Sequence, residues 1–173
     1  MSPRSTPRRI ARRIALSACA CALVGGAAQA RDMLGVWNDW GAFRDPAVPR
    51  CYAIAMALPQ PGSHRPSQPY TTVATWPKRG IRGELHIHLS RPLAAGSPVA
   101  LIIGSAKFAL KPGGIDAWAM DGRMDAAIIA AMRSGSEMTV LAKGSDGHTM
   151  RDAYRLAGAA SAMDAASLGC ANA

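Results

Sequence analysis

Residues 84–89 (ELHIHL) alternate strictly between polar and apolar side chains. A period of two is typical of a β-strand that buries one of its faces. The three apolar side chains are expected to point into a core, and the polar face carries Glu84, His86 and His88. This segment is the strongest strand signal in the chain, and it favours a fold built from a sheet.

Other segments have the composition of short strands separated by turn residues. Residues 51–58 (CYAIAMAL) place a cysteine and three alanines on one face, and residues 71–76 are rich in β-branched and aromatic side chains. Residues 59–69 are rich in proline and predict a loop. Residues 144–147 (GSDG) predict a hairpin turn. Further strands are expected within residues 33–43, 99–103, 107–110, 137–142 and 149–156.

Two segments are expected to be helical. In residues 121–134 apolar side chains recur at helical spacing, at Met124, Ile128 and Met132. Asp121 can cap the start of this helix, and Gly135 supplies its stop. Residues 158–168 are rich in alanine and predict a short terminal helix. Many short strands with one or two small helices predict a single all-β sandwich domain.

Residues 1–30 have the features of an export signal. Five arginines and no acidic residue precede a short apolar stretch, and the last three residues (AQA) match a signal-peptidase site. We expect Sec export with cleavage after Ala30, a mature domain of residues 31–173 without a transmembrane span, and a periplasmic or secreted location. The alternative is a lipoprotein that begins at Cys19, because residues 16–19 (LSAC) resemble a lipobox.

Removal of this signal changes the charge of the chain. The whole sequence has 20 basic and 11 acidic residues and a formal net charge of +9. Five of the basic residues and none of the acidic ones lie in residues 1–30, so the mature chain keeps 15 basic and 11 acidic residues, a net charge of +4. This mild excess does not indicate a nucleic-acid partner, and it supports an anionic partner only weakly.

The mature chain contains two cysteines, Cys51 and Cys170. An even pair in an exported protein predicts one disulfide, because the compartments outside the cytosol are oxidising. This disulfide would close a loop over nearly the whole domain. The alternative is a pair of separate buried thiols.

Several segments, in their order and spacing, resemble the invasion-associated locus B family of exported bacterial proteins. They are residues 37–43 (WNDWGAF), 49–55 (PRCYAIA), 75–80 (TWPKRG), 125–133 (DAAIIAAMR), 147–158 and 162–165. The resemblance covers most of residues 33–170. It implies an envelope protein with an immunoglobulin-like β-sandwich, whose namesake is associated with bacterial entry into host cells, and it supplies no catalytic residues. Members often carry further cysteines that this chain lacks, which leaves Cys51 and Cys170 to pair with each other.

A loop between two expected strands combines an aromatic ring with cations. Trp76, Lys78, Arg79 and Arg82 lie within seven residues of one another. Arginine and lysine beside tryptophan are suited to an anionic headgroup, a glycan or a phosphate. The alternative is a strand end whose basic residues keep a turn solvated.

His86 and His88 lie two residues apart on one face of an expected strand. Two imidazoles that project in the same direction can bind Zn²⁺ or Cu²⁺, and Glu84 is the nearest further ligand on that face. The alternative is a polar strand face exposed to solvent.

The sequence has no recognisable catalytic set. Ser145, Asp146 and His148 are too close together to form a hydrolytic triad, and a hairpin turn accounts for them. We therefore expect a non-enzymatic protein without a cofactor, which binds or supports an envelope or surface component. The alternative is a periplasmic metal-binding module that uses His86 and His88.

Overall fold

The computed structural model describes residues 31–62 and 64–171, together with Met1. The export signal, the lipobox and the cleavage site predicted above lie outside the described residues. In chain order the elements are β1 (Asp32–Trp37), β2 (Trp40–Asp45), β3 (Arg50–Met56), β4 (Tyr70–Trp76), the 3₁₀ turn η1 (Pro77–Arg79), β5 (Ile81–His88), β6 (Val99–Ile103), β7 (Ala106–Gly113), β8 (Asp116–Trp118), α1 (Gly122–Ser134), β9 (Glu137–Lys143), β10 (Thr149–Arg155) and α2 (Ala159–Gly169).

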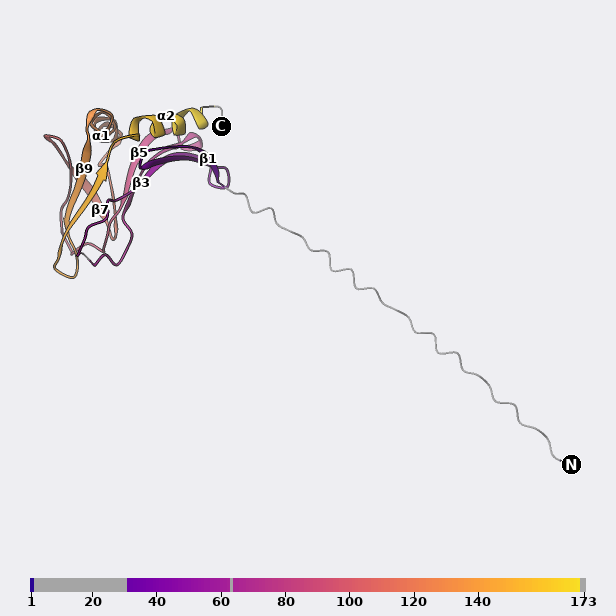
Figure 1. Ribbon diagram of the computed structural model, residues 1–173, viewed down its shortest axis with the longest axis horizontal. Helices are drawn as coiled ribbons and strands as arrows, with labels where there is room; N and C mark the ends of the chain where they lie inside the picture. Colours follow the sequence, from indigo (N-terminus) through magenta and orange to yellow (C-terminus); the bar gives the residue numbers. More distant parts are fainter. Residues whose placement is uncertain (2–30, 63, 172–173) are drawn as a thin grey trace.

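The ten described strands form one antiparallel sheet in the order β1-β2-β3-β4-β5-β8-β7-β6-β9-β10. The sheet is folded over, so that β1, β3 and β5 lie in one layer and β7 and β9 in the other (Figure 1). The result is a sandwich-like, mainly β fold with two α-helices, which confirms the predicted fold class. Neither described helix is long and apolar enough to cross a membrane.

The core lies between the two layers and follows the predicted alternation. Leu85, Ile87 and Leu89 are fully buried, as the pattern of residues 84–89 predicts. The opposite layer contributes Leu101 and Val140, which are also fully buried. One hydrophobic cluster therefore joins both layers of the sheet.

Residues 33–43 are strand, as predicted, in two pieces: β1 and β2 pair as a hairpin whose turn contains Asn38 at a φ of 53°. Strand β8 was not predicted at all. It has three residues and follows two glycines, so its sequence has no usable periodicity. Because the chain crosses from β5 to β6 before it returns, β8 pairs with β5.

Helix α2 packs against β1, β2 and β3 through small side chains. Figure 1 shows it along these strands. Ala53 and Ala55 of β3 and Ala162 of α2 are buried at this contact. Gly158 precedes the helix at a φ of 89°, and a Cβ atom there would lie 2.0 Å from the carbonyl oxygen of Trp37. Only glycine fits this close approach.

The predicted disulfide joins β3 to the end of α2. The sulfur atoms of Cys51 and Cys170 are 2.01 Å apart, and the two Cα atoms are 5.7 Å apart. Both residues are buried. The bond connects positions 119 residues apart and holds α2 on the sheet.

Helix α1 begins as predicted but ends for a different reason. Asp121 accepts a hydrogen bond from the amide of Met124 at 2.8 Å, which confirms the N-cap. Gly135 ends the helix in an extended conformation with a φ of −82°, so a left-handed stop does not explain it. A Cβ atom at Gly135 would lie 2.8 Å from Cγ2 of Ile103 and 3.1 Å from Cδ1 of Leu156. Close packing therefore selects glycine there.

Gly135→Ala is expected to lower the free energy of unfolding by about 1–2 kcal/mol, because the added methyl group overpacks this contact. The matched control is Gly122→Ala at the other end of α1, where a Cβ atom would meet nothing within 4 Å. Urea unfolding of both variants measures the difference. Equal stabilities of the two variants would show that packing does not select Gly135.

Candidate anion-binding site

The side of the sheet that faces away from α2 carries most of the aromatic rings. Cys51 bonds to the end of α2, so its neighbour Tyr52 lies on the opposite side of β3. Strand register places Tyr52 opposite Phe43 and Ala74, and His86 opposite Trp118. We call this side of β1–β5 and β8 the aromatic face, and its rings belong to Phe43, Tyr52, Tyr70, Trp76, His86, His88 and Trp118.

Two guanidinium groups lie over the ring of Trp76 on the aromatic face. The Cζ atoms of Arg50 and Arg79 are 5.2 and 5.1 Å from the centre of that ring. Arg50 also lies 4.8 Å from the ring centre of Tyr52. The indole of Trp76 donates a hydrogen bond to Oε2 of Glu84 at 2.7 Å, which fixes the orientation of the ring. These contacts are cation–π interactions that position both cations.

Arg50 and Arg79 differ from most other arginines in having no carboxylate partner among the described residues. Nε of Arg50 is buried and has no hydrogen-bond partner within that part of the chain. Six other arginines form ion pairs with aspartate, namely Arg31–Asp45, Arg44–Asp32, Arg65–Asp152, Arg91–Asp146, Arg133–Asp164 and Arg155–Asp39. The terminal N–H groups of Arg50 and the N–H groups of Arg79 are therefore available to an anion from outside the chain, whereas the buried Nε of Arg50 is not.

The structure separates the four residues predicted to form an anionic-ligand loop. Trp76 and Arg79 are in contact, and the neighbouring Lys78 is exposed. Arg82 instead lines a hollow with Ser167 and Cys170 near the end of α2. The prediction also missed Arg50, which comes close to Trp76 because Cys51 pairs with Thr75. Only the strand register, which the sequence does not show, could have identified it.

His86 and His88 share one partner on the neighbouring strand. Nε2 of His86 and Nδ1 of His88 are each 2.9 Å from Oδ1 of Asp116, the first residue of β8. Glu84 does not join them, because it accepts from Trp76. Within residues 31–62 and 64–171, no three His, Cys, Asp or Glu side chains are grouped to hold a metal ion.

The loop between β3 and β4 adds a serine to this histidine pair. Oγ of Ser67 is 2.8 Å from Nε2 of His88. The ring of Tyr70 stacks on the imidazole of His88 at 5.0 Å, and Trp118 lies 5.3 Å from His86. The imidazoles are consequently only 23% and 21% exposed, so this is not the solvated strand face considered above.

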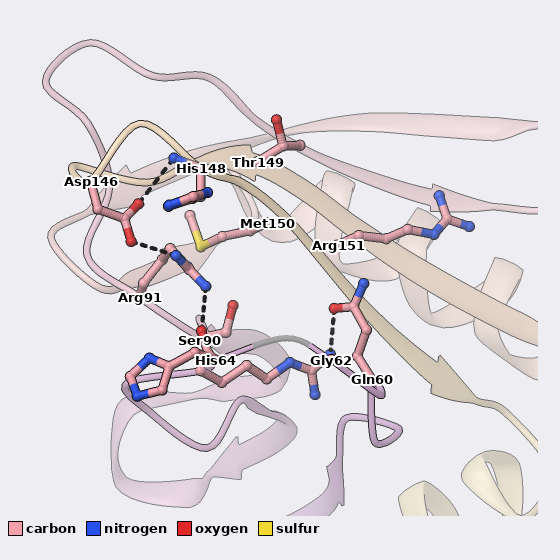
Figure 2. Close-up of a pocket in the computed structure, with 11 residues that line it drawn as sticks. Gln60, Gly62, His64, Ser90, Arg91, Asp146, His148, Thr149, Met150 and Arg151 are labelled. Carbon is pink, nitrogen blue, oxygen red and sulfur yellow. Dashed lines mark hydrogen bonds and ion pairs between the residues drawn. The ribbon is translucent and has the colours of Figure 1, made fainter.

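A second cationic region is a cleft of about 460 Å³ between the 59–69 loop and the β9–β10 turn (Figure 2). Arg91 donates to Asp146 and to the carbonyl oxygen of His64 there. Asp146 also accepts from the amide of His148 at 3.1 Å, and this bond and Arg91 hold the pKa of Asp146 below its ordinary value. Asp146 therefore belongs to a hairpin turn, as predicted. Because Asp146 neutralises Arg91, this arginine is less available to an outside anion than Arg50 and Arg79 beside Trp76.

Comparisons with protein-family models, with curated proteins and with solved structures find no match to this chain. The likeness to the invasion-associated locus B family therefore depends on the sequence motifs alone.

Proposed function

We propose that the chain is an exported binding protein of the cell envelope, related to the invasion-associated locus B family, and that it holds an anionic envelope component on Arg50 and Arg79. The observation that carries this proposal is the pair of guanidinium groups over Trp76 without a carboxylate partner among the described residues. The export signal in the sequence supports a location outside the cytosol, and so does the buried disulfide.

The chemistry of the ligand follows from the donors. Each guanidinium group offers several N–H donors in a plane, which suits the oxygens of a carboxylate, sulfate or phosphate. The ring of Trp76 limits the motion of both side chains before binding, so less conformational entropy is lost in the complex. Acidic polysaccharides and anionic phospholipids both carry such groups.

The double variant Arg50→Gln/Arg79→Gln is expected to lose at least about tenfold in affinity, because a hydrogen bond to a charged group contributes about 1.5 kcal/mol or more. Calorimetric titration with dextran sulfate measures the loss of affinity for an acidic polysaccharide. Sedimentation with phosphatidylglycerol vesicles measures it for an anionic phospholipid. Uncharged dextran and phosphatidylcholine vesicles serve as blanks.

The matched control is Lys107→Gln/Arg123→Gln, which changes the net charge equally. Both side chains are exposed, and neither lies beside Trp76 or lines the cleft at Arg91. The control variant should keep nearly all of the affinity. An equal loss in both double variants would reduce the interaction to general charge attraction, and no binding of either anionic probe by the unmodified chain would refute the proposal.

Metal binding by His86 and His88 stays a prediction. Both imidazoles are directed at Asp116 rather than at a shared empty position. No metal-binding function is proposed from them.

A further inference from the structure

Three side chains on the aromatic face form a hydrogen-bonded series that anion binding does not use. Ser67 Oγ is 2.8 Å from Nε2 of His88, and Nδ1 of His88 is 2.9 Å from Oδ1 of Asp116. We propose that Ser67 is a nucleophile, with His88 as its general base and Asp116 as the residue that positions His88, and that this site cleaves carboxylic esters.

The hydrogen-bond partners determine which nitrogen of His88 carries the proton. As a carboxylate, Asp116 can only accept, so the proton of the neutral imidazole is on Nδ1. The lone pair of Nε2 then faces Ser67, whose hydroxyl donates to it. A serine that donates to a histidine, which in turn donates to an aspartate, is the arrangement that activates serine in acyl transfer.

Three separate segments hold these groups in place. His88 lies in β5 between its register partners Tyr70 of β4 and Asp116 of β8. His86 bonds to the same oxygen of Asp116, which further fixes that carboxylate. The amide of Ser67 donates to the carbonyl oxygen of Ser90 at 3.1 Å and anchors the serine loop. Ser67, unlike the adjacent group at residues 145–148, therefore meets a histidine from a different part of the chain.

The side chains of His88 and Asp116 are mostly covered but keep 21% and 27% of their surface exposed, and a substrate carbonyl would approach through this exposed part. Within the described part of the chain, the amide of Gln68, directly after the serine, donates to no other group. That amide can donate to the oxyanion that forms on a substrate carbonyl. A single donor stabilises the oxyanion only modestly. The substrate we expect is therefore an ester with a good leaving group and not an amide.

The reaction balances without a cofactor. Ser67 Oγ forms a bond to the carbonyl carbon while its proton moves to Nε2 of His88. The bond from that carbon to the leaving oxygen breaks, and His88 returns the proton to the leaving alcohol. A water molecule then attacks the acyl group by the same route, which releases the carboxylic acid and restores Ser67.

A fluorophosphonate probe tests the nucleophile, because it forms an Oγ–phosphorus bond and releases fluoride only with an activated serine. Intact-mass and peptide spectrometry of the purified chain should show one adduct, located on Ser67. Ser67→Ala should remove it, whereas the exposed Ser145→Ala should be labelled like the unmodified chain. No adduct on the unmodified chain, or an adduct that persists in Ser67→Ala, would overturn the proposal.

Asp116→Ala tests the positioning role separately. We expect labelling to slow by at least about a hundredfold, since loss of the aspartate leaves the histidine in the wrong tautomer. The ¹⁵N spectrum of the His88 ring should show that the Nδ1–H form is depleted, which a change in stability alone would not produce. An unchanged tautomer with an unchanged labelling rate would remove Asp116 from the site.

Discussion

The double variant Cys51→Ala/Cys170→Ala is expected to lower the free energy of unfolding by about 2–5 kcal/mol. The disulfide closes a loop between positions 119 residues apart, which restricts the unfolded chain strongly. It also holds α2 on β3, where both cysteines are buried. Urea unfolding of the oxidised and variant chains measures the loss, and amide exchange should show that α2 becomes the least protected element.

The two single variants provide the control for this prediction. Cys51→Ala and Cys170→Ala each remove the same covalent bond, and each leaves one thiol that packs as a small apolar group. We expect both single losses to equal that of the double variant to within about 0.5 kcal/mol, because coupled positions are not additive. Unequal single losses, or losses that add in the double variant, would show that local packing and not the bond dominates.

Most of the fold could be predicted because its elements have local signals. The alternation of residues 84–89 identified β5 and its buried face, and Asp121 marked the start of α1. The disulfide was predicted from two cysteines that follow a predicted export signal. Where local signals were absent the prediction was incomplete, as for β8, whose three residues depend on pairing with β5.

The candidate sites were harder to predict because they depend on pairing between distant segments. Trp76 and Arg79 are close in sequence and were identified, but Arg50 reaches Trp76 only through the register of β3 with β4. Asp116 and Ser67 likewise approach His88 from a short strand and a proline-rich loop. Neither segment has a periodicity that indicates which way its side chains point, so the sequence could not show these contacts.

The second large effect is expected at the buried ion pair between the 59–69 loop and β10. Asp152 is fully buried, and its Oδ1 is 3.5 Å from a terminal nitrogen of Arg65, whose side chain is 13% exposed. Oδ2 of Asp152 accepts from the amide of Ser90 at 3.1 Å. Arg65→Ala is expected to lower the free energy of unfolding by about 3–5 kcal/mol, because it leaves a buried carboxylate without its cation.

The size of this loss should depend on pH. Burial raises the pKa of Asp152 above its ordinary value of 3.8, although bonds from Ser90 and the charges of Arg65 and Arg91 oppose the shift. The carboxyl group of Asp152 therefore binds its proton more tightly in the native state than in the unfolded chain. Lowering the pH from the raised pKa toward 3.8 consequently stabilises the native state relative to the unfolded chain. Without Arg65 the charged form of Asp152 is disfavoured further, and its pKa rises further. Unfolding at about pH 7 and about pH 4.5 should therefore show a smaller loss for Arg65→Ala at the lower pH.

A surface ion pair is the matched control for this experiment. Arg155 and Asp39 are 61% and 42% exposed and 3.0 Å apart, so Arg155→Ala is expected to cost at most about 1 kcal/mol. The combination Arg65→Met/Asp152→Asn should recover most of the loss, because it removes both charges and keeps an acceptor for Ser90. Equal losses in Arg65→Ala and Arg155→Ala, or a loss in Arg65→Ala that does not change with pH, would mean that Asp152 does not depend on Arg65 for its charge.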